Sequence, residues 1–359
     1  MVLSVLSFWT YGARWLELIA LCLIFSTSAG RADQPAGWRI QNPYAGVDWT
    51  SWESCPASLH VHTTRSDGKL TPAQAIDAYA RLDYKILALT EHDTKGPGGN
   101  RQDPDREKTT WPWSAFGRDP AALGMVAIEG NEMSAQHHLG SYFSGFGAAA
   151  APSMDYILTE IGKRNGLAVF FHPGRYDQPA AWYAQLFRQH PCAIGLEAYS
   201  DGDSFPQDRK KWDEILSRLP ERTVWGFSND DMHKPKNKLG RNWNIFLLPE
   251  LTSQAARACM ENGTFFYVYA AQGHSGEPPP AVKNIVVDET NGTIAIEAGG
   301  CGPIEWISKN EALQRGPIFR LADAPATINY VRAELRSPGG STLLGTQPFR
   351  IAPISSAGE

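Results

Sequence analysis

The stretch Ser58-Leu59-His60-Val61-His62, followed by Ser66-Asp67-Gly68 and then by Thr71-Pro72, decides the fold class. Its first five residues are predicted to form a strand, and the period-2 geometry of a strand turns His60 and His62 to one face. The Thr-Pro pair is typical of a helix start, with an N-cap residue and a proline at the first helical position. A strand that ends in polar residues and leads into a helix is the first unit of an α/β fold.

The same alternation of strands and helices continues to about residue 270. Further strands are predicted at residues 85–90, 125–128, 139–146, 167–171, 193–199, 223–227, 244–248 and 265–269, and further helices at 153–165, 180–189, 208–219 and 252–261. This pattern indicates a parallel sheet, open or closed into a barrel. After the stiff segment Glu277-Pro278-Pro279-Pro280, short strands with Gly-rich turns and no convincing helix predict a small β-sandwich module at 281–359.

Length and composition limit the classes of protein that fit. At 359 residues, one large and one small domain are expected. With 42% hydrophobic and 11% aromatic residues the chain can bury a sizeable core, which excludes disordered, collagen-like and repeat-array proteins. The formal net charge is −5, and no run of Lys and Arg is long enough to follow a phosphate backbone. Nucleic acid is therefore not expected as the main partner.

A secretory signal is predicted at residues 1–32. The basic Arg14 is followed by an apolar run at residues 15–25 and by small residues at 26–30, with cleavage expected after Ala29 or Ala32. The apolar run is shorter than the roughly 20 residues that span a bilayer. The alternative is a membrane anchor formed by the uncleaved signal. The chain is therefore expected to be exported, to the periplasm or the medium.

Beyond the signal, four cysteines remain, namely Cys55, Cys192, Cys259 and Cys301. None of them is spaced as CxxC, so a thiolate zinc site or a redox motif is not supported. Four cysteines allow three disulfide pairings, and the sequence selects none of them. Buried free thiols fit equally well.

Histidines and carboxylates gather at the predicted strand ends. They are His60 and His62, Asp67, His92, Glu129 and Glu132, His137 and His138, His172, and Asp231 with His233. In a barrel of this class the carboxyl ends of the strands form the face that carries the chemistry. Such a group without a metal would bury unpaired polar atoms at a cost in free energy, whereas imidazole and carboxylate are ligands of Zn, Mn and Fe. A single strand-end histidine is usually structural, so the joint arrangement is what predicts a metal centre.

The motifs at these positions resemble those of the PHP (polymerase and histidinol phosphatase) family. The series is His60-Val61-His62, Ser66-Asp67-Gly68, Thr90-Glu91-His92-Asp93-Thr94, Gly130-Asn131-Glu132-Met133-Ser134, His172-Pro173 and Asp231-Met232-His233. The resemblance covers about residues 55–270 and is closest to the stand-alone, exported branch with an appended β-module. It implies a distorted seven-stranded β/α barrel, placed here at residues 50–276, with a centre of three divalent ions that hydrolyses phosphoesters.

The resemblance also implies a set of ligands. One ion would be held by His60, His62, Glu132 and Asp231, a second by Glu132, His172 and one of His137 or His138, and a third by Asp67, His92 and His233. His138 is preferred to His137 because the period-2 continuation then sends Leu139 outward. Glu129 is a second candidate beside Glu132, and the Gly-x-Glu-x-Ser context favours Glu132. Zn, Mn and Fe are the expected metals.

Two further residues are expected to act in catalysis. Arg175 follows His172-Pro173-Gly174 and could bind a phosphate bidentately, as could Arg241; the alternative for each is a surface arginine or one paired with a carboxylate. Glu197 is expected to orient a metal ligand or to close a structural ion pair, and Asp93 and Asp230 have the same two alternatives.

The leading hypothesis from these residues is a metal-dependent phosphoesterase. A hydroxide that bridges the ions would attack a small phosphorylated compound. A second hypothesis is a metal-dependent amide or ester hydrolase, because the same nucleophile attacks carbonyl carbon. A third is a non-catalytic exported binding protein with structural metals, whose β-module holds a glycan or an envelope surface.

Overall fold

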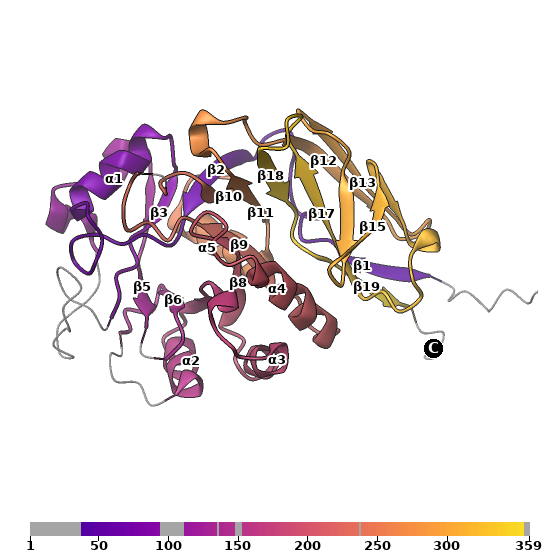
Figure 1. Ribbon diagram of the computed structural model, residues 1–359, viewed down its shortest axis with the longest axis horizontal. Coiled ribbons are helices and arrows are strands. Elements are labelled where there is room, and N and C mark those ends of the chain that lie inside the picture. Colours follow the sequence, from indigo (N-terminus) through magenta and orange to yellow (C-terminus); the bar gives the residue numbers. More distant parts are fainter. Residues whose placement is uncertain (1–36, 94–110, 135, 148–152, 237, 355–359) are drawn as a thin grey trace, which may run out of the picture. The chain divides into compact units, whose positions relative to one another are not determined.

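The protein is described by a computed structural model over residues 37–93, 111–134, 136–147, 153–236 and 238–354. One compact unit spans Pro35–Glu359, and its helices and strands are shown in Figure 1. The signal predicted at residues 1–32 lies outside the described residues and stays a prediction. In the described part of the chain, no helix has both the length and the apolar character needed to cross a membrane.

The α-helices begin where the sequence places their caps. The described α-helices are α1 (Pro72–Arg81), α2 (Met154–Lys163), α3 (Ala180–Gln189), α4 (Gln207–Arg218) and α5 (Ser253–Asn262). Thr71 and Gln74 form a reciprocal capping box at the start of α1, and the Ser153 and Thr252 hydroxyls accept a backbone N–H each at the starts of α2 and α5. Helix α5 ends at Gly263, whose φ of 70° is the left-handed conformation that glycine adopts at low cost. The five predicted helices are confirmed to within two residues.

The described strands form three sheets. The largest has the order β1-β19-β17-β18-β11-β10-β2-β3-β4, with β14 paired to β17 and to β15. Its strands are β1 (Trp38–Gln41), β2 (Glu53–Ser58), β3 (Ile86–Ala88), β4 (Val126–Ile128), β10 (Asn242–Leu248), β11 (Phe265–Ala270), β14 (Glu305–Ser308), β15 (Glu311–Arg315), β17 (Tyr330–Arg336), β18 (Thr342–Gly345) and β19 (Phe349–Pro353). The second sheet is β5 (Gly130–Met133), β6 (Leu139–Tyr142), β7 (Leu167–Phe170), β8 (Ala193–Ser200) and β9 (Trp225–Asn229). The third is β12 (Ala281–Asp288), β13 (Thr293–Gly299) and β16 (Ile318–Arg320).

Only part of the predicted parallel sheet is parallel. The pairs β2–β3, β3–β4, β7–β8 and β8–β9 are parallel, whereas β5–β6, β6–β7, β2–β10 and β10–β11 are antiparallel. Strand β6 follows β5 after a short connection, and such a connection returns the chain antiparallel. Among the described strands the two larger sheets meet through two isolated bridges, Val61–Met232 and His92–Glu132, and do not close into a barrel. The fold is therefore mixed α/β, and the seven-stranded barrel is not confirmed.

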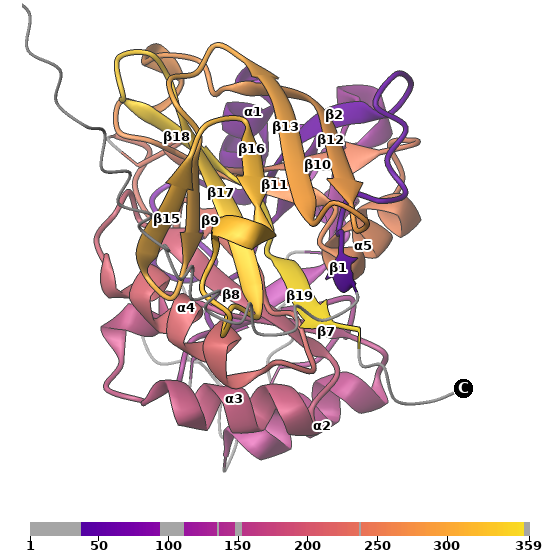
Figure 2. The same ribbon diagram turned by 90° about the vertical axis from the view of Figure 1, so that its right-hand side faces the viewer.

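The C-terminal strands continue the large sheet. Strand β18 pairs with β11, with Tyr267 opposite Gly345, so this sheet crosses the predicted boundary between residues 50–276 and 281–359. The three-stranded sheet, seen in Figure 2, shares one apolar cluster with the large sheet, in which Ile294 and Phe319 join Trp306 and Val331. The division into a domain and a β-sandwich module stays a prediction.

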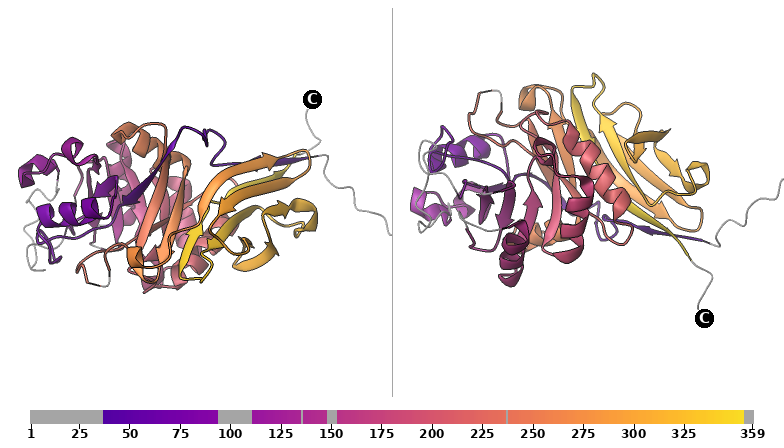
Figure 3. Two further views of the ribbon diagram at one scale, coloured as in Figure 1. Left: turned by 90° about the horizontal axis from the view of Figure 1, so that it is seen from above. Right: turned by 60° about the horizontal axis from the view of Figure 1, so that its bottom comes forward.

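Helices α2, α3 and α4 cover the five-stranded sheet (Figure 1). Their apolar side chains, among them Ile157, Phe187 and Trp212, pack with Phe170 and Leu196 of the sheet. Helix α4 also lies beside the C-terminal strands (Figure 3), where Asp213 forms an ion pair with Arg332 of β17. Helix α4 therefore connects the five-stranded sheet to the C-terminal strands.

Candidate metal centre

Nine of the predicted side chains come together beyond the strand ends. The sources are the segments after β2 (His60, His62 and Asp67), β3 (His92) and β7 (His172), strand β5 (Glu132), the residue before β6 (His138), and the segment after β9 (Asp231 and His233). Their ligand atoms form four groups, each within 4.8 Å: His62–Asp67–His92–His233, His60–His62–Glu132, His60–His172–Asp231, and His92–Glu132–His138. We call these nine residues the metal cluster. The strand predicted at residues 58–62 is displaced, because β2 spans Glu53–Ser58 and shares only Ser58 with the prediction. The residues after β2 are held by a bond from the His62 N–H to the Met232 carbonyl.

The Glu132 carboxylate is the hub of the metal cluster. It is fully buried, and five imidazole rings approach it. Its Oε1 lies 2.6 Å from His138 Nδ1, 3.6 Å from His60 Nε2 and 3.7 Å from His172 Nε2, and its Oε2 lies 2.7 Å from His92 Nδ1 and 3.2 Å from His62 Nε2.

These donors fit divalent cations. Both Glu132 oxygens and Asp231 Oδ1 are buried without a hydrogen bond of adequate geometry from any described residue, although ring nitrogens lie close to them. Buried polar atoms are almost always hydrogen-bonded, so such a set needs an explanation. Neutral imidazole and ionised carboxylate both present lone pairs to the centre, as Zn, Mn and Fe require. The side chains present are therefore the right ones for a centre of divalent metal ions.

One side of the metal cluster faces solvent. Asp231 Oδ1 lies 3.2 Å from the Nε2 atoms of both His60 and His62, which are completely buried. Asp67 lies 3.1 Å from His233 and 3.6 Å from His92, and the Asp67 and His233 side chains are 21% and 32% exposed. A substrate would therefore reach the cluster from the side of Asp67 and His233.

Burial and charge shift the pKa values of the metal cluster. Burial alone would lower the pKa of His62, but Asp231 and Glu132 outweigh it and raise the pKa to about 9. Burial lowers the pKa of His92 to about 4 against the opposing effect of Glu132. Burial would raise the pKa values of Glu132 and Asp231, yet the surrounding imidazoles hold both well below their ordinary range. Metal binding at such a site releases protons from the histidines.

The backbone at the metal cluster is strained at two positions. His172 has a φ of 28° and Asp231 a φ of 47°, which is the left-handed region that side-chain-bearing residues rarely adopt. Each such residue costs on the order of 1–3 kcal/mol and persists only where surrounding contacts hold it. Gly68 has a different constraint, because a Cβ there would lie 2.4 Å from the His62 carbonyl oxygen. The Ser66-Asp67-Gly68 turn therefore needs glycine at its third position.

Glu197 lies behind the metal cluster, where a ligand-orienting carboxylate is expected. It is fully buried, its Oε1 accepts from His60 Nδ1 at 2.9 Å and from Asn229 Nδ2 at 3.0 Å, and its Oε2 accepts from the His172 N–H at 2.8 Å. A proton on His60 Nδ1 leaves the Nε2 lone pair directed at the centre. Glu197 thus orients one histidine and anchors the backbone of another.

Four other predicted residues lie outside the metal cluster. His137 is turned away, with Nε2 2.7 Å from the Tyr183 hydroxyl and Nδ1 2.8 Å from the His138 carbonyl. Glu129 is half-buried, and burial raises its pKa. Arg175 is exposed, and its side chain makes no hydrogen bond or ion pair with another described residue. The Arg241 guanidinium is partly buried and packs against Gly202.

Three further carboxylates brace the loops that carry the metal cluster. Glu91, for which the sequence predicts no role, accepts from the Thr63 N–H and hydroxyl and from the Ser66 hydroxyl. Asp93 accepts from the Ser134 N–H at 2.8 Å, and Asp230 from the backbone N–H groups of residues 240–242. The signal for Glu91 was its position between Thr90 and His92 at a buried strand end.

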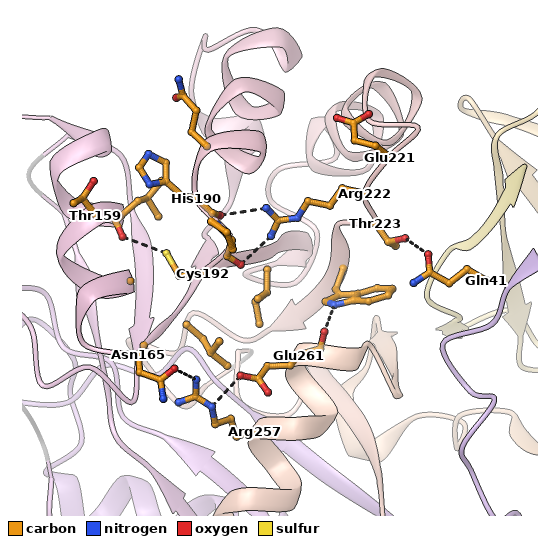
Figure 4. A pocket seen from close by; sticks show the side chains of 18 residues that line it. Gln41, Thr159, Asn165, His190, Cys192, Glu221, Arg222, Thr223, Arg257 and Glu261 are labelled. Atoms are coloured by element: carbon orange, nitrogen blue, oxygen red, sulfur yellow. Dashed lines mark hydrogen bonds and ion pairs between the residues drawn. The ribbon is translucent and has the colours of Figure 1, made fainter.

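One pocket is lined by residues that lie outside the metal cluster. It measures about 850 Å³, and Leu167, Ile194 and Trp225 line it at the amino ends of β7, β8 and β9 (Figure 4). Its charged groups bind one another: Arg257 pairs with Glu261 at 3.0 Å, and Arg222 donates to backbone carbonyls of residues 187–193. The two arginines that line this pocket are therefore already bound within the chain.

Three solved structures are similar to this chain. A two-domain protein from Bacteroides vulgatus, described as containing a predicted PHP-like metal-dependent phosphoesterase, is 14% identical with a TM-score of 0.48, over 90% of this chain and 92% of that one. An amidohydrolase from Chromobacterium violaceum with bound sulfate and no metal is 18% identical with a TM-score of 0.37, over 51% and 89%. A protein from Bifidobacterium adolescentis, described as a metal-dependent phosphoesterase, is 15% identical with a TM-score of 0.36, over 50% and 87%.

Two of the three descriptions mention a metal-dependent phosphoesterase, and one of these two calls it PHP-like. At these identities and TM-scores the likeness fixes neither activity nor substrate. No protein-family model and no curated protein matches the chain.

Proposed function

We propose that this chain is a metal-dependent hydrolase and, more narrowly, a phosphoesterase of the PHP class that acts on small phosphorylated compounds. The observation that supports this most strongly is the buried Glu132 carboxylate, which is approached by five imidazoles and left without a hydrogen bond from the described residues. A structural cluster would be expected to satisfy such a group internally. A group that needs cations and opens to solvent at Asp67 and His233 is suited to binding and activating an anionic substrate.

The proposed site holds three divalent ions, Zn, Mn or Fe. Following the motif resemblance, the donors would be His60, His62, Glu132 and Asp231 for the first, Glu132, His138 and His172 for the second, and Asp67, His92 and His233 for the third. Members of each set lie close to one another. Divalent ions bound there would supply a water of lowered pKa as nucleophile and positive charge for the phosphoryl oxygens. Glu132 would belong to the donor sets of both the first and the second ion.

The protein's own side chains have separate tasks in this proposal. Glu197 holds the proton on His60 Nδ1, so His60 presents Nε2 to the centre. Arg175 is exposed three residues after His172 and is available to bind a phosphate oxygen. Asp67 and His233 form the entrance, so a phosphate monoester would enter there with its leaving group toward solvent.

We also infer that the protein acts outside the cytoplasm, because residues 1–32 have the sequence features of a secretory signal. Fractionation of expressing cells, with the N-terminus of the mature chain determined, would test this. Recovery of full-length chain in the cytoplasm would contradict it.

The hydrolase is tested with p-nitrophenyl phosphate on protein stripped by chelator and reloaded with Mn, Zn or Fe. We expect hydrolysis that chelator abolishes and metal restores, and that Glu132→Gln removes. Glu129→Gln is the matched control, since Glu129 lies three residues earlier and outside the metal cluster, and it should retain activity. Amide and carboxylic ester substrates run in parallel. If only the amide or carboxylic ester substrates are hydrolysed, the protein is a hydrolase but not a phosphoesterase. If no substrate is hydrolysed, the protein binds metal without this catalytic role.

A further inference from the structure

The turn that follows β7 is held in an unfavourable conformation by another part of the chain. His172 has φ 28° and ψ 61°, and a short 3-10 helix, Pro173–Arg175, follows directly. This turn carries both a candidate ligand, His172, and the exposed Arg175. Since a strained residue persists only where its surroundings hold it, the contacts of this turn decide where His172 points.

Two side chains of helix α4 form hydrogen bonds with the backbone of this turn. Asp208, in the first turn of α4, accepts from the Gly174 N–H at 2.5 Å. Lys211, one helical turn later, donates to the Pro173 carbonyl at 2.9 Å and to the Tyr176 carbonyl at 2.6 Å. A Cβ on Gly174 would lie 2.7 Å from Asp208 Oδ1, so the close approach requires the glycine. The two side chains thus fix the segment that follows His172.

The same segment also supports a second candidate ligand. The Tyr176 hydroxyl accepts from the His138 N–H at 3.1 Å, and its ring stacks on His137 at 3.9 Å between ring centroids. A shift of the turn would therefore displace His138 as well as His172. Both residues belong to the proposed second ion.

Asp208 is poorly explained as a stabiliser of the fold. Its side chain is fully buried, Oδ1 binds one N–H, and Oδ2 has no hydrogen-bond partner among the described residues. A buried carboxylate that is only half satisfied costs more free energy than one hydrogen bond returns. Helix α4 has other anchors, namely the Trp212 indole bonded to the Val224 carbonyl and Asp213 paired with Arg332. The position of Asp208 therefore indicates a task at the turn.

We propose that Asp208 and Lys211 are positioning residues, which hold the His172–Tyr176 segment so that His172 and His138 bind the same metal ion. This proposal depends on the proposed function in one respect, namely that the metal cluster binds divalent ions. Residues that orient metal ligands from behind typically change metal affinity or activity by 10- to 100-fold when replaced.

The test is metal binding without substrate, by titration of chelator-stripped protein with Zn and with Mn. We expect Asp208→Ala and Lys211→Met to weaken the second ion at least tenfold, within the range for such residues. Asp208→Asn should bind metal like the wild type, because the amide oxygen still accepts from Gly174. Lys210→Met is the matched control, since Lys210 is the exposed neighbour on α4. In the hydrolysis assay, Asp208→Ala should lower kcat more than it raises KM.

Wild-type metal affinity in both Asp208→Ala and Lys211→Met would overturn the proposal, as would equal losses in Asp208→Asn and Asp208→Ala. If Asp208→Ala does not fold, Lys211→Met decides, because Lys211 is only partly buried. If the wild type binds metal but hydrolyses no phosphoester, the proposed function fails while the positioning role is still tested. If hydrolysis is observed and the variants bind metal normally, the positioning role fails alone.

Discussion

Two clusters of buried charged side chains in this protein differ in how many of their polar atoms have hydrogen-bond partners within the chain. In the first, Arg332 of β17 donates to both oxygens of Asp213 at 3.1 Å and to Glu334 at 2.6 Å and the Tyr267 hydroxyl at 3.0 Å. No atom of Arg332, Asp213 or Glu334 is buried without a partner in the described structure. We call this group the arginine cluster. In the metal cluster, both oxygens of Glu132 are left without one.

The difference separates a structural role from a binding role. The arginine cluster pairs its charges within the chain and ties α4 to the C-terminal strands, so it needs no ligand. The metal cluster places more acceptors together than its N–H groups can satisfy, and divalent ions remove that deficit. Buried charge alone therefore does not mark a binding site, whereas the convergence of several buried acceptors without hydrogen-bond partners favours one.

Metal removal should lower the stability of the folded protein more than any of the substitutions below. It should act on the metal cluster and leave the arginine cluster unchanged. A ligand at 1,000 times its Kd stabilises the folded state by about 4 kcal/mol for one site, and several ions contribute here. We expect chelated protein to melt at a distinctly lower temperature and to recover on addition of Zn or Mn. Calorimetry with and without metal checks this, and an unchanged melting temperature would contradict it.

Breaking the arginine cluster should cause the next largest loss of stability. This loss should be the same whether or not metal is bound. Arg332→Met leaves Asp213 and Glu334 buried without their cation, which costs about 3–5 kcal/mol. Urea denaturation of the metal-free variant measures it. Arg336→Met is the matched control, since Arg336 is half exposed and 3.7 Å from Glu334, and it should change the unfolding free energy by less than about 1 kcal/mol. Equal effects of the two variants would remove the structural role given to Arg332.

The pH dependence of the metal-free protein should reveal the charges of the metal cluster. The pKa of His62 is raised to about 9 in the folded state, where burial is outweighed by Asp231 and Glu132, against about 6.5 when unfolded. The ion pairs of protonated His62 therefore stabilise the folded state fully below about pH 6.5. This stabilisation is lost as the pH rises through about 9.

We expect the melting-temperature difference between metal-free wild type and His62→Gln to shrink over that range. Saturating metal should abolish the trend, because metal takes the neutral imidazole. A difference that stays constant from about pH 6.5 to about 9 would show that His62 is already neutral in the metal-free protein over that range.

The smallest effect is expected from Gly68→Ala, which changes no charge in either cluster. The added Cβ would meet the His62 carbonyl at 2.4 Å, so the Ser66–Gly68 turn must shift and carry Asp67 with it. We expect the ion held by Asp67, His92 and His233 to bind about tenfold more weakly, with the others unaffected. Competition titration with a chromogenic chelator measures this, and unaltered binding of all ions would show that the turn adapts.

Much of the metal cluster could be predicted from the sequence because its residues stand at strand ends, and strand ends are readable from local patterns. The period of a strand predicts that His60 and His62 share a face, and both approach Glu132 although β2 ends at Ser58. Helices α1, α2 and α5 start at their capping residues. His138 and not His137 faces Glu132, and the local pattern favoured this only weakly.

What the sequence could not provide depends on packing between distant segments. Asp208 and Lys211 lie on an ordinary amphipathic helix, and only the tertiary fold brings them to the turn after His172. Strand β5 was missed because Gly130–Met133 shows no alternation of apolar and polar residues. The antiparallel β10–β11 pair follows from tertiary arrangement, since the helix between them fits a parallel pair equally well.

Elemental analysis of the purified protein tests the central claim most directly. After exhaustive dialysis against metal-free buffer, we predict close to three equivalents of Zn, Mn or Fe in each chain, bound by the four donor groups of the metal cluster. The His60→Ala, His62→Ala double variant should retain clearly fewer. A wild-type protein that folds and retains less than one equivalent, even after incubation with each metal, would contradict the account.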